Sequence, residues 1–261
     1  MKSPPRVDYD ALAPTYNTRF EAASARPDIA RALADLARNL HAHRILEAGC
    51  GTGHWLAGLR PLTSQCYGLD PSAGMLAQAR RQSAPWRLLR GRGERLPFAA
   101  GTLDMVYCVN ALHHIAEPRA FVHEARRALR PGGLLALIGM DPHGRRGSWY
   151  IYDYFAGSYE TDLARFPSWE VVLDWLDAAG FTQLTRQPVE HILDPKKGRA
   201  VFADPFLRKH AVSQLALLSD TAYAAGLRRI ETALAANENL VFPVDILTEM
   251  VWGVRSKGVG E

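Results

Sequence analysis

The residues best suited to bind a ligand lie in the run ILEAGCGTGHW, residues 45–55. Gly49, Gly51 and Gly53 alternate there, directly after an apolar run and just before a short stretch of helical character. Because glycine has no Cβ, it lets the backbone turn sharply and lets a ligand lie against it. The helix that follows offers backbone N–H groups without an intrahelical partner. The run therefore predicts a turn that cradles a bound molecule.

Two acidic residues accompany this turn. Glu47 stands two positions before the first glycine, and Asp70 ends the next expected strand. In α/β folds that bind nucleotides, an acid at that second place accepts hydrogen bonds from ribose hydroxyls. Taken singly, Asp70 is equally compatible with a helix N-cap, but the order of the whole set favours a nucleoside site. The G-x-G-x-G spacing differs from the G-x-G-x-x-G turn of dinucleotide sites and disfavours a nicotinamide oxidoreductase.

The elements that must position these residues alternate between strands and helices. A helix with its apolar residues on one face is expected at 28–40, capped by Asp28. Beyond it, strands are expected at 44–49, 65–70, 86–91, 103–110 and 134–140, and helices at 54–61, 72–82 and 119–130. Fully apolar strands that alternate with helices predict βαβ units, hence a parallel sheet with helices on both faces.

The second half of the chain has a different texture. Residues 141–167 are expected to form a loop rich in aromatic residues. A helix is expected at 169–180, strands at 181–193 and 246–256, and further helices at 207–218 and 221–236. The prediction is an α/β fold with a doubly wound, Rossmann-like sheet of seven strands, a terminal antiparallel hairpin and a small helical cap. The expected units are an N-terminal helical segment (1–40), the Rossmann-like domain (41–196), the cap (197–238) and the last strand (239–261).

Several further motifs follow the glycine turn in order. They are Pro71-Ser72 with Met75-Leu76, the run Gly93 to Phe98, Leu103 to Val106, Asn110 to Ile115 (NALHHI) and Leu129 to Gly133. Together with E-x-G-x-G-x-G and the acid after the second strand, they resemble the class I S-adenosylmethionine-dependent methyltransferases. The nearest resemblance is to the "type 11" or ubiquinone-biosynthesis-like members. It covers roughly residues 8–140 well and the rest of the chain in outline.

The resemblance implies a role for each matching position. It places S-adenosyl-L-methionine against Tyr16, Glu47, Gly49, Cys50, Gly51, Gly53, Asp70, Pro71, Met75, Gly93, Glu94 and Asn110. Glu47 and the glycine backbone would hold the methionine part, Asp70 the ribose hydroxyls, and Met75 would pack on the adenine. Asn110 would lie beside the sulfonium. The family often has an acid where this sequence has Arg92, so the adenine amino group would rely on Glu94 or on backbone contacts.

The residues that would carry methyl transfer are histidines. A sulfonium is already an activated leaving group, so the enzyme must mainly align the reactants. A hydroxyl or carbon acceptor also needs a base, and histidine suits neutral pH. His114 is the first candidate and His113 the second, because both follow the fourth strand at its carboxyl end, and His143 is the third. A supporting role is the alternative for each, and Cys50 is expected to fill space rather than act as a nucleophile.

The acceptor side is suggested by aromatic residues. Trp149, Tyr150, Tyr152 and Tyr154 follow the fifth strand and are expected to line an acceptor pocket, although they could equally anchor the loop. A cap and an aromatic loop enclose a small organic molecule better than a folded RNA, and the methyl group would go to O, N or C. The runner-up is an RNA or protein methyltransferase with a basic groove near His113. A non-catalytic S-adenosylmethionine-binding protein is the alternative from another class.

Composition excludes several other functions. The chain is 48% hydrophobic and 22% charged, which is typical of a globular protein. Its formal net charge of +4 comes from scattered basic residues, so no nucleic-acid partner is expected. Three cysteines without a CxxC pair predict neither disulfides nor a metal site. The N-terminus lacks a signal-peptide core and no run could cross a bilayer, which favours a cytoplasmic location. A homodimer is left open.

Overall fold

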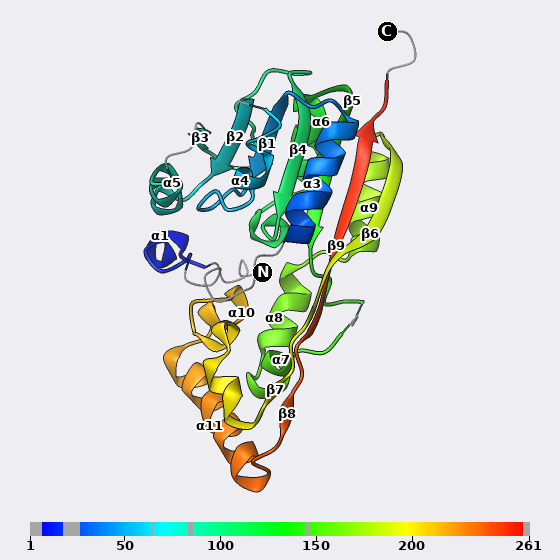
Figure 1. Ribbon diagram of the computed structural model, residues 1–261. Coiled ribbons are helices and arrows are strands. Elements are labelled where there is room, and N and C mark those ends of the chain that lie inside the picture. The colour runs from blue at the N-terminus through cyan, green and yellow to red at the C-terminus, as the bar shows by residue number, and fades with distance from the viewer. Residues whose placement is uncertain (1–6, 18–26, 64, 83–85, 145–146, 258–261) are drawn as a thin grey trace.

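The structure is a computed structural model, and it describes residues 7–17, 27–63, 65–82, 86–144 and 147–257. A mixed sheet of seven strands forms its upper lobe, in the order β3-β2-β1-β4-β5-β9-β6 (Figure 1). The strands are β1 (Arg44–Ala48), β2 (Gln65–Asp70), β3 (Arg87–Arg90), β4 (Leu103–Val109), β5 (Leu129–Gly139), β6 (Phe181–Leu193) and β9 (Asp245–Arg255). β1 to β5 are parallel, and β9 runs antiparallel to both β5 and β6. The expected Rossmann-like sheet with two antiparallel terminal strands is confirmed.

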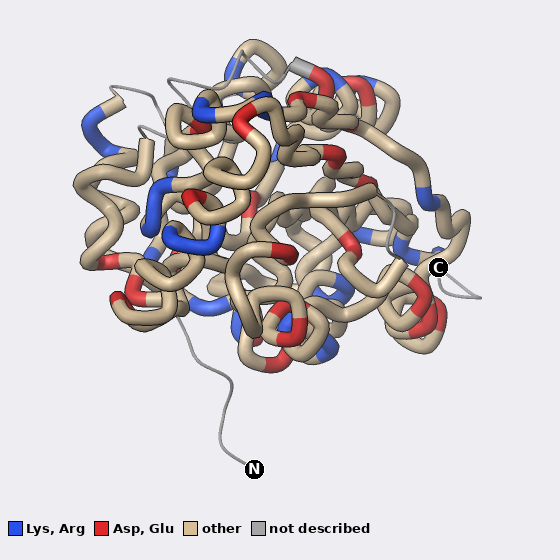
Figure 2. The backbone as a smooth tube through the Cα atoms, turned by 90° about the horizontal axis from the view of Figure 1, so that it is seen from below, with Lys and Arg blue, Asp and Glu red and all other residues tan. Residues whose placement is uncertain are grey.

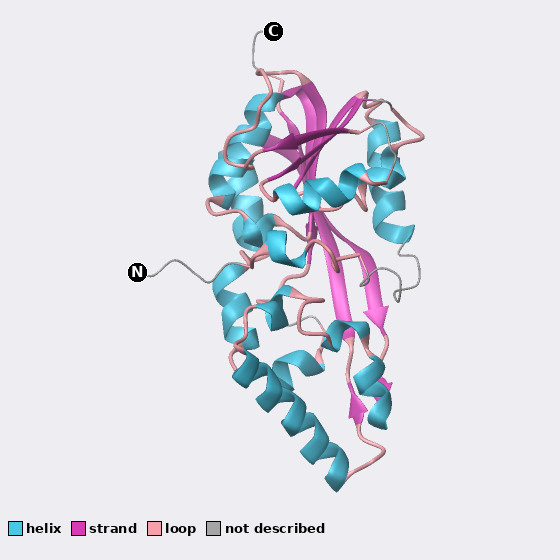
Figure 3. Ribbon diagram, turned by 90° about the vertical axis from the view of Figure 1, so that its left-hand side faces the viewer, coloured by secondary structure: helices cyan, strands magenta, loops and turns pink. Residues whose placement is uncertain are grey.

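Helices pack on both faces of this sheet (Figure 3). One face carries α3 (Pro27–Asn39), α4 (Leu56–Leu59) and α5 (Ala73–Arg80), and the other carries α6 (Pro118–Ala128) and α9 (Trp169–Ala178). Successive side chains of a strand point to opposite faces. Ile45 and Met105 accordingly pack under α3, while Leu46 and Val106 pack under α6. Both faces of the central strands β1, β4 and β5 are largely buried, which is why these three strands are mostly apolar.

Most of the expected elements of the upper lobe are present, with small shifts. The expected first long helix is α3, but Asp28 lies inside its first turn instead of capping it. A short helix, α1 (Tyr9–Leu12), precedes it and is capped by Asp8. Residues 1–6 and 18–26 of the expected N-terminal segment, and residues 258–261 after the last strand, lie outside the described residues.

A second lobe lies below the carboxyl ends of the strands (Figure 1). It is larger than the segment 197–238 expected from the sequence, and from here on we call the whole lobe the cap. β6 and β9 extend from the sheet down into it. It contains α7 (Tyr150–Tyr154), α8 (Ser158–Arg165), α10 (Ser213–Ala216), α11 (Asp220–Ala236), β7 (Lys196–Lys197), β8 (Val241–Phe242) and the 3-10 turns η2 (Gly198–Ala203) and η3 (Pro205–Leu207). Its core joins two distant segments, since Tyr150 and Phe155 pack with Leu215, Ile230 and Phe242.

Two expectations for this lobe were wrong. Residues 141–167 were expected to be a loop, yet they contain α7 and α8; residues 207–218 were expected to be one helix, yet only α10 is helical there. These helices are short, and such helices are stabilised by packing rather than by their own propensity. Phe155, for example, packs so tightly on α11 that a Cβ at Gly226 would lie 2.2 Å from its ring.

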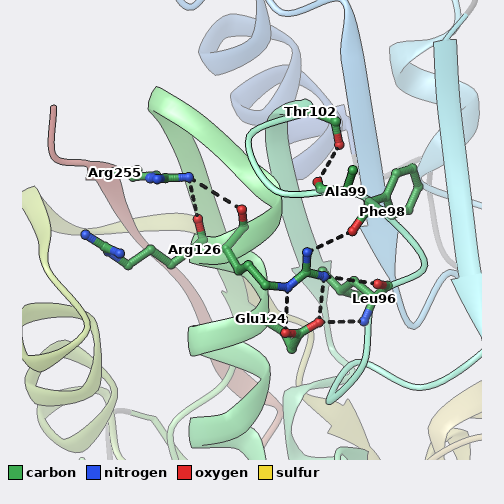
Figure 4. Close-up of polar contacts among 8 residues, drawn as sticks. Leu96, Phe98, Ala99, Thr102, Glu124, Arg126 and Arg255 are labelled. Atoms are coloured by element: carbon green, nitrogen blue, oxygen red, sulfur yellow. Dashed lines mark hydrogen bonds and ion pairs between the residues drawn. The ribbon is translucent and has the colours of Figure 1, made fainter. Parts of the chain in front are cut away.

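The loop between β3 and β4 is fixed to α6 by an arginine (Figure 4). The Arg127 guanidinium donates to the carbonyls of Leu96 (3.2 Å) and Phe98 (2.9 Å) and pairs with Glu124 (2.8 Å). Glu124 in turn accepts from the Leu96 N–H at 3.0 Å. At the end of α6, Arg255 donates to the carbonyls of Arg126 and Leu129, which caps the helix. The loop between β3 and β4 is therefore anchored to the last turn of α6.

Candidate active site

The glycine turn between β1 and α4 has the backbone that its sequence predicts. Gly49, Gly51 and Gly53 have φ of 74°, 52° and 82°, in the left-handed region that favours glycine. A Cβ at Gly49 would lie 2.5 Å from Ala111 Cβ, and one at Gly53 would lie 2.6 Å from the Trp86 ring. A Cβ at Gly51 would meet nothing within 4 Å. Gly51 thus faces open space, whereas the other two glycines permit close packing.

Asp70 ends β2 directly beside this turn. Its Oδ2 accepts from the Gly51 N–H at 2.8 Å, and its Oδ1 accepts from the Ser72 N–H at 2.8 Å. Burial raises the pKa of this carboxyl, partly offset by those two hydrogen bonds. A carboxylate oxygen can accept more than one hydrogen bond. Asp70 therefore shapes the turn and still offers acceptors to a ligand.

Glu47 is a fully buried carboxyl in β1. The Tyr107 hydroxyl donates to its Oε2 at 3.2 Å, while Oε1 has no hydrogen-bond partner in the described part of the chain. Burial is the main cause that raises the pKa of Glu47 well above its usual value. A buried polar atom without a partner is costly and calls for a specific explanation. A cationic ligand group at Oε1 would supply the missing partner.

A cavity at the glycine turn brings five of the predicted cofactor residues together. It is lined by Tyr16, Gly49, Cys50, Gly51, Thr52, His54, Trp55, Val109, Asn110 and Phe206. Asn110 follows β4 with a left-handed φ of 50°, which turns the chain at the carboxyl end of the sheet. Phe206 comes from η3 of the cap, more than 150 residues after the glycine turn in the sequence. No local pattern marks Phe206, so sequence reasoning missed it.

Seven other predicted cofactor residues do not line this cavity: Glu47, Gly53 and Asp70, described above, and Pro71, Met75, Gly93 and Glu94. Met75 is buried in α5, and Pro71 is exposed, with its carbonyl accepting from Arg90 Nε at 3.1 Å. Gly93 packs against Phe121. Glu94 Oε1 accepts from the N–H groups of Ala116 (2.9 Å) and Glu117 (3.3 Å), so this carboxylate holds the turn before α6.

The N-terminal segment lies against the same end of the sheet. Asp10 Oδ1 accepts from the Ser72 hydroxyl and from the Gly74 N–H, both at 2.7 Å, and fixes α1 to the start of α5. These hydrogen bonds lower the pKa of Asp10. Thr52 Oγ1 donates to Asn17 Oδ1 at 2.7 Å and ties the segment to the glycine turn. Asp10 was not expected from the sequence, because its partners are 62 and 64 residues away.

The three candidate histidines converge below this turn. The Tyr9 hydroxyl and His114 Nε2 are 2.6 Å apart. The rings of His114 and His113 are 3.9 Å apart, and His113 stacks on Phe166 at 3.8 Å. His143 Nε2 lies 2.8 Å from the Phe166 carbonyl, to which it donates, so this nitrogen cannot accept a proton. His114 beside Tyr9 is the pair best placed to accept one.

The candidate acceptor aromatics lie in the cap and do not line the cavity at the glycine turn, although the Trp149 ring packs edge-on against Phe206, which does. Tyr150 is fully buried and donates to Asp204 at 2.9 Å, and the Tyr154 ring packs against Phe242. Trp149 and Tyr152 line a second cavity, with Asp141, Tyr159, Asp245 and neighbouring residues. Cys50 is buried, which raises the pKa of its thiol well above the usual value and fits a space-filling role better than a nucleophile.

The described residues contain neither a helix that could cross a membrane nor a group of three side chains arranged to hold a metal. Seen from the cap end, described Lys and Arg residues alternate with Asp and Glu and form no continuous basic stripe (Figure 2).

Known proteins resemble this chain in sequence. A family pattern described as a methyltransferase domain matches residues 46–137. The malonyl-[acyl-carrier protein] O-methyltransferase of Laribacter hongkongensis is 31% identical over 220 residues, which cover 78% of this chain and 72% of the relative. The phthiotriol/phenolphthiotriol dimycocerosates methyltransferase of Mycobacterium leprae is 34% identical over 117 residues, 43% of each chain. In the first curated relatives matched, the similar region spans about half of their length, from 43% to 66%.

The fold is also found in solved structures. A protein from an antibiotic biosynthesis pathway of Anabaena variabilis superposes with a TM-score of 0.65 at 22% identity, over 86% of this chain and 96% of that one. The sheet order, the glycine turn with its open face and the buried Glu47 agree with the sequence relationships. The chain belongs to the class I S-adenosylmethionine-dependent methyltransferases, in the family whose methyltransferase-domain pattern matches residues 46–137.

Proposed function

We propose that this protein transfers the methyl group of S-adenosylmethionine to a small organic molecule held between the sheet and the cap. The observation that carries the proposal is a shared cavity. The glycine turn lines one side of it, and Phe206 of the cap lines another. Enclosure of this kind suits a small ligand.

The residues at the turn fit the cofactor of this family. Glu47 Oε1 is a buried acceptor without a partner, which suits an ammonium group, and Asp70 offers acceptors to ribose hydroxyls. The open space at Gly51 leaves room for a ligand against the backbone. When bound, S-adenosylmethionine would supply a methyl group on a positively charged sulfur. The neutral thioether left after transfer needs no acid to assist its departure. The protein's own task is to align the acceptor and to exclude water.

The Tyr9–His114 pair favours an acceptor that must lose a proton. A hydroxyl or an acidic carbon needs a base, and His114 Nε2 would take the proton directly or through the Tyr9 hydroxyl, which passes its own proton on. An amine acceptor is the second candidate, because a neutral amine carries its own lone pair and needs alignment only. Relatives named for O-methylation of a malonyl group support the oxygen acceptor.

The RNA or protein alternative is less well supported. That alternative expects a basic groove near His113. The His113 ring stacks on the apolar Phe166 ring, which gives no support for such a groove. Lys and Arg are also interspersed with acids at the cap end (Figure 2). Of the acceptors in the names of the relatives, phthiotriol is a small molecule, and malonyl-[acyl-carrier protein] is a small acyl group carried on a protein; neither is a nucleic acid.

The test is transfer of label from methyl-tritiated S-adenosylmethionine to a cell extract separated into small-molecule, RNA and protein fractions. We expect label in the small-molecule fraction with the wild-type protein and none with Gly51→Ala. Label that appears only in RNA, or in protein from which hydrolysis releases no labelled small acyl group, would support the runner-up. The absence of label from every fraction, with S-adenosylhomocysteine still bound, would favour a non-catalytic binding protein.

A further inference from the structure

A buried polar cluster in the cap is not used by the function proposed above. It comprises Tyr152, Asp162, Arg165, Ser213 and Gln214, from α7, α8 and α10. Asp162 Oδ2 accepts from the Tyr152 hydroxyl at 2.8 Å and from Gln214 Nε2 at 2.5 Å. Arg165 Nη2 donates to Ser213 Oγ at 2.8 Å. The Asp162 and Arg165 side chains are 0% and 3% exposed, so both charges are out of water.

The two charges of this cluster do not satisfy each other. Arg165 Nη2 and Asp162 Oδ1 are 3.9 Å apart, too far for a hydrogen bond. Arg165 Nη1 is buried without any hydrogen-bond partner among the described residues. Burial lowers the pKa of Arg165 and raises that of Asp162. A buried guanidinium normally needs its N–H groups paired, so the cluster lacks one acceptor.

A chain of ring contacts joins the unpartnered guanidinium to the candidate base. Arg165 Cζ is 5.6 Å from the Phe166 ring, and that ring stacks on His113, whose neighbour His114 contacts Tyr9. Tyr9 is also close enough to Arg165 to act on its charge. A ligand group bound to Arg165 would therefore lie within a few side chains of the base.

We propose that Arg165 binds an anionic group of the methyl acceptor, a carboxylate or a phosphate, and so selects acidic acceptors. This inference rests on the proposed function, because it assigns part of the acceptor of that reaction. The planar guanidinium matches the oxygens of either anion and stays charged where a lysine would lose its proton. Ser213 Oγ, which accepts from Arg165 Nη2, orients the guanidinium.

The test is calorimetric titration of malonate, and of the neutral malonamide of similar shape, into protein saturated with S-adenosylhomocysteine. We expect malonate to bind in a one-to-one ratio and Arg165→Met to weaken it by about tenfold or more, as expected for losing a charged hydrogen bond. Malonamide should bind at least about tenfold more weakly than malonate. Arg229→Met is the matched control, because Arg229 is an exposed cap arginine that donates to the backbone carbonyls of Asp153 and Tyr154.

Two further variants separate binding from folding. Arg165→Met with Asp162→Asn removes both buried charges together, which avoids an uncompensated carboxylate, and it should fold and still lose malonate. Asp162→Asn alone should keep malonate binding or strengthen it. Equal affinity in wild type and Arg165→Met, equal affinity for malonamide, or loss of binding in Asp162→Asn would each overturn the proposal. The titration measures malonate binding and needs no turnover. A parallel titration without S-adenosylhomocysteine shows whether malonate binding depends on the bound cofactor product. Failure of this proposal can therefore be told apart from failure of the methyltransferase proposal.

Discussion

The two sides of the candidate active site are built in different ways. The cofactor side is local: Glu47, the three glycines and Asp70 lie within two strands and one turn, and most of their contacts are with backbone atoms. The acceptor side is assembled from α1, η1 (Leu112–His114), α8 and η3, which are far apart in the sequence. Backbone-built sites depend on glycines and spacing, whereas assembled sites depend on how helices pack.

Each side leaves buried polar atoms that a ligand could pair. On the cofactor side each Asp70 oxygen accepts a hydrogen bond from a backbone N–H, while Glu47 Oε1 has no hydrogen-bond partner among the described residues. In the cap, Arg165 Nη1, Asp162 Oδ1 and Trp149 Nε1 are buried without such partners in the same part of the chain. Unpartnered groups of this kind are tolerated where a ligand completes them. The comparison thus locates specificity in the cap and cofactor binding in the sheet.

The sharpest way to break this division is Gly51→Ala. We expect the affinity for S-adenosylhomocysteine to fall by about a hundredfold or more, because the new methyl group would fill space that the ligand occupies. The backbone strain at this positive φ should cost only about 1–2 kcal/mol of stability. Gly101→Ala and Gly157→Ala are matched controls, since both have positive φ and open space around the new Cβ. Calorimetry should show normal affinity in both controls. Normal affinity in Gly51→Ala would place the cofactor elsewhere.

The acceptor side is tested by His114→Ala. Turnover should fall by about a hundredfold, and its rise through about pH 6–7 should flatten, while affinity for S-adenosylhomocysteine stays the same. Tyr9→Phe should have a smaller effect in the same direction. His123→Ala, an exposed histidine on α6, is the control. Full activity of His114→Ala, His113→Ala and His143→Ala would remove histidine from the mechanism and support an amine acceptor.

Asp70→Asn tests the cofactor side more gently. The amide keeps the shape but places a donor opposite a backbone N–H, so affinity should fall by about 1.5–3 kcal/mol, or roughly ten- to a hundredfold. Asp104→Asn is the control, because Asp104 also accepts from two backbone N–H groups, at the opposite end of the sheet. It should lower stability and leave calorimetric affinity unchanged. Similar losses of affinity in both variants would show that Asp70 acts only through the fold.

The smallest expected effect is on pH-dependent stability. Because folding raises the pKa of Glu47, its contribution is complete below the unfolded pKa and is lost as the pH rises. The melting temperature of the wild type should therefore fall relative to Glu47→Gln between pH 5 and 8, by about 2–4 °C for 1 kcal/mol.

Glu124→Gln is the control of opposite sign. Its hydrogen bonds to Arg127 lower the pKa of Glu124, so its stabilisation is present above the unfolded pKa and disappears as the pH falls. The advantage of the wild type over this variant should shrink in acid. If Glu47→Gln and Glu124→Gln shift the melting temperature with the same pH trend, Glu47 is not the desolvated acid described here.

The sequence predicted much of the sheet and of the glycine turn for a physical reason. Strand periodicity, positive-φ glycines and an acid after β2 are local properties of the chain. It did not predict that Phe206 reaches the cofactor cavity, that Asp10 fixes α1, or that Arg165 lies near His113, because each contact depends on tertiary packing. The aromatic run 149–155 was mistaken for loop because α7 is stabilised by the cap core and has little helical pattern of its own.

The most direct test of this account is a crystal structure with S-adenosylhomocysteine bound. We predict that its amino group contacts Glu47 Oε1, that its ribose hydroxyls contact Asp70, and that its sulfur faces the space between Asn110 and the Tyr9–His114 pair. A ligand whose sulfur faces away from His114, or one bound outside the glycine turn, would contradict the division between cofactor and acceptor sides.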